Sequence, residues 1–189
     1  MISLKLYGEQ KMVIKQVYIY FSLLVIGLYS TNLSADTIQI LALGNSLTAG
    51  YGVQNSNNFT NQLQKALRKQ GLLVHVTNAG VSGDTSAGGR ARLAWTLSRK
   101  QPDLVIIELG GNDALRGINP KTTLTNMEFI ITELKRRGIG IVLTGMKAPP
   151  NMGREYVNEF NSIYPYLAKK HKLHFYPFFL DGVATIRKL

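Results

Sequence analysis

The stretch "DLVIIEL", residues 103–109, decides the fold that this sequence predicts. Its consecutive apolar residues would face both sides of a sheet, which is typical of a central strand in a parallel sheet. Four other short apolar runs also read as strands. They are "TIQILAL" (37–43), "LLVHVTN" (72–78), "IGIVLTG" (139–145) and "LHFYPF" (173–178).

Longer segments with helical periodicity separate these strands. They are "FTNQLQKALRKQG" (59–71), "GGRARLAWTLSRKQ" (88–101), "KTTLTNMEFIITELKRRG" (121–138) and "GREYVNEFNSIYPYLAKKHK" (153–172). Gly71 and Gly138 follow basic turns, as glycines at helix C-termini do, and Pro120 suits a first helical turn. Five strands joined by four helices predict right-handed crossovers in a single α/β domain. The expected fold is a flavodoxin-like three-layer sandwich with a five-stranded parallel sheet.

The loops that follow the strands are the unusual parts of the sequence. In open parallel sheets, ligands bind beyond the carboxyl ends of the strands. In the first of these loops, a tight turn at Gly44 can raise the hydroxyl of Ser46 into a site. The loops are "GNSLTAGYG" (44–52), "AGVSGDTSAGG" (79–89), "GGNDALRG" (110–117) and "MKAPPNMG" (146–153).

A serine nucleophile needs hydrogen-bond donors for the oxyanion that it generates. Gly83 in the second loop can offer a backbone N–H that no side chain blocks, and Asn112 in the third can offer a side-chain amide. Each of these is an ordinary turn residue when taken alone. Because the ends of parallel strands converge, their occurrence together favours a serine hydrolase site.

Phosphate binding is the alternative for the glycine-rich first loop. That loop matches neither the P-loop pattern nor the dinucleotide-binding pattern. A mononucleotide or flavin binder of similar fold stays open, although it would leave "GGND" and "KAPPNMG" without a purpose.

The four loops in this order resemble the SGNH (GDSL) hydrolase family, and more closely its periplasmic thioesterase I/arylesterase branch. The matching blocks are "ADTIQILALGNSLTAGYGV", "NAGVSGDTSAGGRARL", "QPDLVIIELGGNDALRG" and "KAPPNMG". The resemblance covers nearly all of the chain after residue 35. It implies hydrolysis of carboxylic ester or thioester bonds in aryl esters, acyl-CoA and lysophospholipids.

The resemblance also implies roles for single residues. Ser46 would be the nucleophile that forms an acyl-enzyme, and its N–H, that of Gly83 and the Asn112 amide would form the oxyanion hole. The partner would be a small acyl ester or thioester; no metal, no cofactor and a monomeric state are expected. The residues expected to border the substrate are Pro149, Pro150 and Asn151.

Asn45 departs from the family motif, which carries aspartate before the serine. Asparagine keeps the size and an acceptor oxygen and loses the charge. We expect this change to tune the turn and to leave the chemistry in place.

The family's catalytic Asp–His pair is the larger departure. In the family, an aspartate lies three residues before a histidine near the C-terminus, usually in a D-G-x-H-P stretch. Here "FFLDGVATIRKL" (178–189) contains Asp181 and Gly182 without a following histidine. We therefore expect a chain truncated before this pair and before the last helix, and impaired in hydrolysis. The alternative function is acyl binding without efficient turnover.

The three histidines of the chain are not expected to replace the missing base. His75 is predicted inside a strand and His171 at a helix end. His174 starts the last predicted strand, roughly 15 Å from its active end at about 3.3 Å per residue. Without a base, the serine is a weak nucleophile, and loss of a triad member can cost about 10⁶ in turnover.

Residues 1–35 read as a secretory signal. Three lysines precede the uncharged stretch "VYIYFSLLVIGLYS" (17–30), and small residues follow it. This order is typical of a signal peptide, whereas a bilayer-spanning helix needs about 20 apolar residues. A retained N-terminal anchor is the alternative. We therefore expect a hydrolase domain at 36–189 in a periplasmic or secreted protein.

The net charge of +11 raises the alternative of a nucleic-acid binder. The basic residues gather near the C-termini of predicted helices, where cations interact favourably with the helix dipole. No nucleic-acid partner is therefore expected, and membrane contact is expected only through an uncleaved signal or a lipid substrate. The absence of cysteine excludes disulfides, thiolate zinc sites and thiol nucleophiles.

Overall fold

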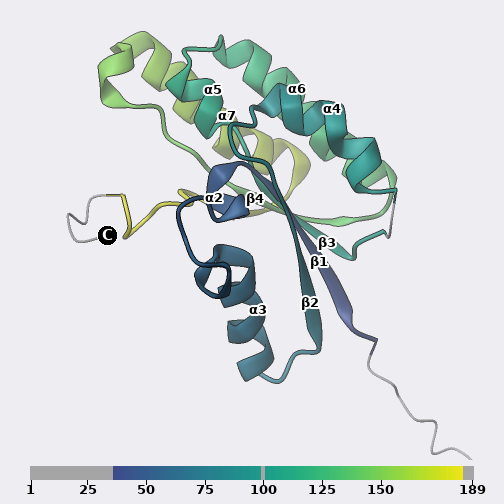
Figure 1. Ribbon diagram of the computed structural model, residues 1–189. Coiled ribbons are helices and arrows are strands. Elements are labelled where there is room, and N and C mark those ends of the chain that lie inside the picture. Colours follow the sequence, from purple (N-terminus) through teal and green to yellow (C-terminus); the bar gives the residue numbers. More distant parts are fainter. Residues whose placement is uncertain (1–35, 99–100, 185–189) are drawn as a thin grey trace, which may run out of the picture. The chain divides into compact units, whose positions relative to one another are not determined.

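Strand β3 (Leu104–Glu108) lies in the middle of a five-stranded parallel sheet, as its apolar sequence predicts (Figure 1). The computed structural model describes residues 36–98 and 101–184. The predictions made for residues 1–35 lie outside these described residues. The other strands are β1 (Ile38–Gly44), β2 (Val74–Gly80), β4 (Gly140–Thr144) and β5 (His174–Tyr176).

The strand order β2-β1-β3-β4-β5 is the flavodoxin-like order that the sequence predicts. All neighbouring strands are parallel. Gly44 at the end of β1 lies opposite Gly80 of β2 and opposite Glu108 of β3. Three strands therefore end at the same level, and their loops leave the sheet side by side.

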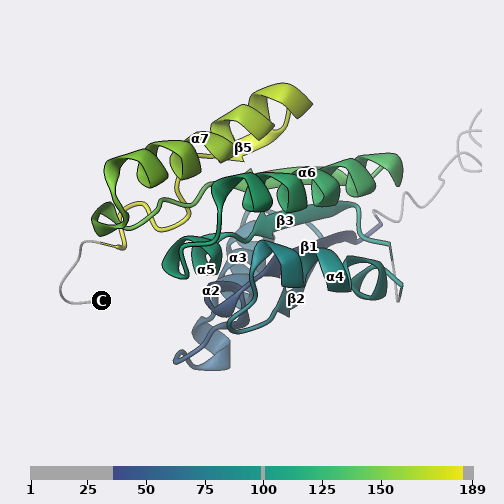
Figure 2. The ribbon, with the colours of Figure 1, turned by 90° about the horizontal axis from the view of Figure 1, so that it is seen from above.

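Helices cover both faces of the sheet, which confirms the three-layer sandwich (Figures 1 and 2). Helix α3 (Phe59–Lys69) covers one face. Three helices cover the other face, namely α4 (Ser86–Thr96), α6 (Pro120–Arg136) and α7 (Arg154–His171). Successive residues of β1 alternate between the two cores, so that Ile40 packs on the α3 side and Leu41 on the other.

The helix ends follow the local sequence. The side chains of Asn58, Thr85 and Asn119 accept backbone hydrogen bonds at the N-termini of α3, α4 and α6. Gly71 and Gly138 follow the basic last turns of α3 and α6 with φ of +86° and +71°. These two glycines therefore end their helices in the left-handed conformation, as predicted.

Two strands differ from the predicted bounds by two residues at one or both ends, and the other three differ by one. The second strand was expected to start at Leu72, but Leu72 and Leu73 are exposed in the turn before β2. Pairing with β1 sets the start of β2, because Val74 lies opposite Ile38. The last strand ends at Tyr176, and the following Pro177 has no N–H to donate to a sheet ladder.

Candidate functional site

A pocket of about 250 Å³ lies where the chain leaves the carboxyl ends of β1 and β3. These two strands are neighbours, and their connecting helices α3 and α6 lie on opposite faces of the sheet. Such a switch point is where open α/β sheets bind ligands. The pocket is lined by Asn45, Ser46, Leu47, Gly111, Asn112, Leu115, Met146, Lys147, Pro149, Phe178 and Leu180.

Ser46 is the first residue of the short helix α2 (Ser46–Ala49), directly after β1. Asn45 caps this helix, because its Oδ1 accepts a hydrogen bond of 2.9 Å from the backbone N–H of Leu47. The same Oδ1 lies 3.4 Å from the Ser46 hydroxyl. The side chains of Thr48 and Glu108 pack directly against the backbone of Gly44. A Cβ at position 44 would overlap both of them, so glycine is required there. The serine is thus presented on a tightly packed turn.

Glu108 lies at the end of β3 and is fully buried beneath this turn. It accepts two hydrogen bonds from Asn45 and two from Thr48. Burial raises the pKa of its carboxyl from 4.5 to about 7, and the four hydrogen bonds oppose this rise only in part. Sequence reasoning missed this residue, although a lone carboxylate at the end of an apolar strand was a visible signal.

Gly83 lies in the loop between β2 and α4 and has a φ of +83°, which strongly favours glycine. Among the contacts that hold this loop to the rest of the site are three made by Val81, Arg116 and Arg92. The N–H of Val81 donates to the carbonyl of Gly44 at 3.0 Å. The guanidinium of Arg116 donates to the carbonyl of Gly83, also at 3.0 Å.

Arg92 of α4 adds the third contact. Its Nε forms an ion pair of 2.6 Å with Asp84, and its Nη2 donates to the carbonyl of Gly44 at 3.0 Å. One guanidinium therefore joins the end of β1 to the loop that contains Gly83. Its side chain is largely covered, with 18% exposure.

Asn112 lies in the short helix α5 (Gly111–Leu115) that follows β3. Its Nδ2 donates a hydrogen bond of 2.7 Å to the backbone carbonyl of Asp84. Because an amide nitrogen carries two hydrogens, a second donor remains for a ligand. This bond also joins Asn112 to the residue next to Gly83, although Gly83 itself is not among the residues that line the pocket.

Two backbone donors at the site are free. No described residue accepts a hydrogen bond from the N–H of Ser46 or from the N–H of Gly83. A free backbone N–H is the kind of donor that can stabilise an oxyanion.

A buried network around Asp113 fixes the helix that carries Asn112. The Asp113 carboxylate accepts hydrogen bonds from the Ser86 backbone at 2.8 Å and from the Thr123 hydroxyl at 3.0 Å. Ser86 also receives a hydrogen bond of 3.1 Å from the Asn126 amide. The network therefore joins α5 to the first turn of α4 and to α6.

The fourth loop reaches the pocket through Met146, Lys147 and Pro149. Pro150 and Asn151 lie in the 3₁₀ turn η2 (Pro150–Met152), outside the residues that line this pocket. Among the described residues that line it, Lys147 alone is charged, and its Nζ lies 4.7 Å from the centre of the Phe178 ring. Sequence reasoning missed both residues, because nothing local marks a lysine or a phenylalanine as part of a site.

The three histidines lie away from the pocket. His75 is exposed in β2, and His174 is exposed at the start of β5. His171 ends α7 and lies 3.2 Å from the carboxylate of Glu128. None of the three lines the pocket with Ser46.

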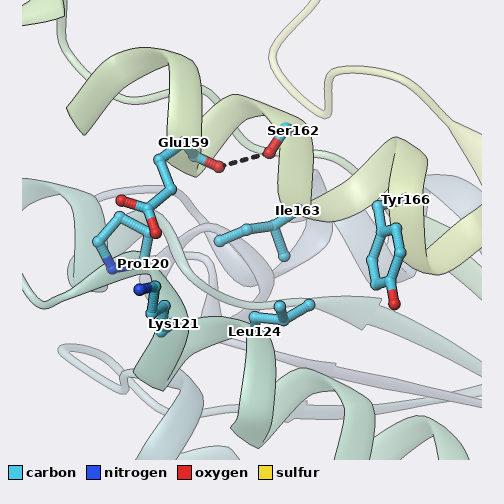
Figure 3. A pocket seen from close by; sticks show the side chains of 7 residues that line it. All are labelled: Pro120, Lys121, Leu124, Glu159, Ser162, Ile163 and Tyr166. Atoms are coloured by element: carbon cyan, nitrogen blue, oxygen red, sulfur yellow. Dashed lines mark hydrogen bonds between the residues drawn. The ribbon is translucent and has the colours of Figure 1, made fainter. Parts of the chain in front are cut away.

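A second cavity of about 330 Å³ lies between α6 and α7 (Figure 3). Unlike the first pocket, it is lined by both a serine and a carboxylate, Ser162 and Glu159. The Ser162 hydroxyl, however, donates to the backbone carbonyl of Glu159 within the same helix. This arrangement is ordinary for a helix and offers no activated nucleophile.

Residues 36–98 and 101–184 contain no group of three histidine, aspartate or glutamate side chains placed to hold a metal ion. Within the same ranges, no helix has both the length and the apolar character needed to cross a bilayer.

Proteins of known family are similar to this chain over most of its length. The model of the GDSL-like lipase/acylhydrolase family matches residues 42–187. The arylesterase of Vibrio mimicus is 42% identical over 147 residues, which are 78% of this chain and 74% of the relative. Thioesterase 1/protease 1/lysophospholipase L1 of Escherichia coli K12 is 39% identical over 150 residues, which are 79% and 70% of the two chains.

A solved structure shares the fold at similar identity. AlinE4, described as an SGNH-hydrolase family esterase, has a TM-score of 0.78 and 46% sequence identity. The similarity covers 81% of this chain and 82% of that chain.

Glu108→Gln tests the burial of the carboxylate. Because its folded pKa of about 7 exceeds the ordinary 4.5, Glu108 contributes stability below about pH 4.5 that is lost as the pH rises through 7. Between about pH 4.5 and 8, the wild type should lose about 3 kcal/mol of unfolding free energy relative to the variant. Neighbouring Tyr164 keeps its proton, because burial raises its pKa well above the usual range. Urea denaturation at several pH values measures the difference.

Glu128→Gln is the matched control for that experiment. Hydrogen bonds from Lys170 and His171 lower the pKa of Glu128, so its contribution is present at neutral pH and lost in acid. The two variants should therefore deviate from the wild type in opposite directions. Parallel pH profiles for wild type and Glu108→Gln would contradict the assignment.

Proposed function

The chain belongs to the GDSL-like lipase/acylhydrolase family, and from this premise we propose that it hydrolyses carboxylic ester or thioester bonds through an acyl-enzyme on Ser46. One observation carries the proposal for the site. Ser46 and Asn112 line the same pocket, beyond the carboxyl ends of β1 and β3, which stop at the same level of the sheet.

In the first step, Ser46 Oγ attacks the carbonyl carbon of the substrate, and the bond from that carbon to the leaving oxygen or sulfur breaks. The serine proton ends on the alcohol or thiol that leaves. The charge on the former carbonyl oxygen is stabilised by the N–H groups of Ser46 and Gly83 and by the Asn112 amide. Water then attacks the acyl-enzyme, releases the acid and restores the serine. Among the described residues, the Ser46 hydroxyl contacts the side chain of Asn45. None of the described residues is assigned as the base that accepts its proton.

The lining of the pocket favours acyl groups of modest size. Its volume of about 250 Å³ is small compared with ligand pockets of about 300–1,000 Å³. Leu47, Leu115, Met146 and Pro149 would contact the acyl chain, whereas Lys147 would face an anionic leaving group. Aryl esters, short acyl-CoA thioesters and lysophospholipids are the substrate classes that we propose.

A second candidate function is acyl binding with little turnover. The observation that favours it is that, within residues 36–98 and 101–184, no histidine and no carboxylate lines the pocket. In that case, acyl esters would bind in the same pocket and product would form slowly.

For residues 1–35 we propose an export signal or an N-terminal anchor, and for the protein a periplasmic or secreted location. The support is the sequence pattern of a basic start, a short apolar stretch and small residues. Expression in a bacterial host, fractionation and N-terminal sequencing test this proposal. Recovery of the intact, uncleaved chain from the cytoplasm would contradict it.

Ser46→Ala tests the proposed nucleophile. The full chain should release p-nitrophenol from p-nitrophenyl butyrate, and the variant should reduce this release to the uncatalysed background. Ser162→Ala is the matched control, because that hydroxyl lies in the second cavity. Equal turnover with and without the Ser46 hydroxyl would refute the nucleophile. Saturable binding of phenyl butyrate without product would favour acyl binding.

Asn112→Ala tests the oxyanion donor. Loss of one such donor typically costs about 10²–10³ in kcat, and KM should change little because the bond forms mainly in the transition state. Steady-state kinetics on the same ester measures both constants. Asn119→Ala, at the N-terminus of α6, removes an amide outside the pocket and should leave kcat unchanged. A rise in KM at constant kcat would argue for ground-state binding instead.

A further inference from the structure

The buried carboxylate of Glu108 divides its hydrogen bonds between its two oxygens. Oε2 accepts bonds from the backbone N–H groups of Asn45 and Thr48, both at 3.2 Å, and from the Thr48 hydroxyl at 2.8 Å. Oε1 accepts a bond of 2.7 Å from the Asn45 side-chain amide. All four donors therefore belong to residues that flank Ser46.

The bond to Oε1 also fixes the orientation of the Asn45 amide. Since Nδ2 points at Glu108, the Oδ1 atom must point the other way, toward the N–H of Leu47 and the hydroxyl of Ser46. An unbroken chain of hydrogen bonds thus runs from the carboxylate, through the amide, to the serine turn. If the amide were reversed, an NH₂ group would face the N–H of Leu47.

A carboxylate is a costly residue at this position. Glu108 is completely buried, and no described residue forms an ion pair with it. An apolar side chain of similar volume often gives equal or greater stability than a buried charge. Stability alone therefore does not explain why a carboxylate is buried here. What distinguishes it from an apolar side chain is that it accepts four hydrogen bonds from the serine turn.

We infer that Glu108 is a positioning residue for Ser46: it fixes the backbone on both sides of the serine and the orientation of the Asn45 amide. The serine hydroxyl and its free N–H are thereby held toward the pocket. This inference rests on the proposed role of Ser46 as the nucleophile.

The donor and acceptor pattern allows a reciprocal test. Glu108→Gln places an NH₂ group opposite the NH₂ of Asn45 and therefore breaks the contact. Asn45→Asp introduces the aspartate that the family motif carries, and we expect it to leave the serine turn in place. The double variant N45D/E108Q restores the contact in the reverse direction, because the new amide at position 108 can donate to the new carboxylate at position 45.

The experiment measures how fast a fluorophosphonate probe labels Ser46 in the full chain, with the labelled residue identified by peptide mass spectrometry. It is carried out at about pH 8, where Glu108 is ionised in the wild type. Glu108→Gln should label about tenfold to a hundredfold more slowly than the wild type, because small misplacements of a reacting group have effects of this size. Asn45→Asp should label at close to the wild-type rate. The double variant should recover most of the wild-type rate.

Thr144→Val is the matched control for a purely structural effect. Thr144 is buried at the end of β4, and its hydroxyl donates to the carbonyl of Ile107 rather than to the serine turn. This variant should lose stability in urea denaturation and label at the wild-type rate. The labelling rates are measured without urea. They are compared only for variants that circular dichroism shows to be folded under those conditions.

The outcomes separate this inference from the proposed function. Wild-type protein that does not label at Ser46 would overturn both. A Glu108→Gln variant that labels at the wild-type rate would overturn the positioning role alone. A double variant as slow as Glu108→Gln would also overturn it, because the contact between positions 45 and 108 would then not be the cause.

Discussion

The common level at which β1, β2 and β3 end is the constraint on which the site depends. Gly44 lies between Gly80 and Glu108 in the sheet, so three loops start from adjacent points. A shift of one residue in the pairing of β1 and β3 would turn every side chain of one strand to the other face. The Ser46 turn would then no longer lie above the Glu108 carboxylate. The position of the serine therefore depends first on the strand register, and the contacts within the loops add to it.

Most of the fold could be predicted because its signals are local. Apolar runs, helical periodicity and glycines after basic turns indicated the parallel sheet, the two helical layers and the ends of α3 and α6. The start of β2 could not be predicted in this way. Leu72 and Leu73 are as apolar as the residues of the strand, and only pairing with β1 decides that they stay in the turn.

The site, like the fold, has residues that local sequence signals predict and residues that they do not. Ser46, Gly83 and Asn112 could be singled out because each lies in a loop whose glycines and polar residues are locally unusual. The partners of these residues could not, since their importance arises from contacts between distant segments. Asp113 joins three helices, and Lys147 meets Phe178 across the fourth and last loops. Glu108 is an intermediate case. Its place at the end of an apolar strand can be read from the sequence, whereas its four hydrogen-bond donors cannot.

The contacts of Arg92 have a consequence for conformational entropy. Ordering a backbone residue costs about 1–2 kcal/mol, and a mobile loop meets that cost when a ligand binds. Here a largely covered guanidinium already joins Asp84 to the end of β1, so this cost is met when the protein folds. A substrate that enters the pocket would not need to order the loop around Gly83. Its binding free energy would then be available for interactions that strengthen as charge develops on the substrate.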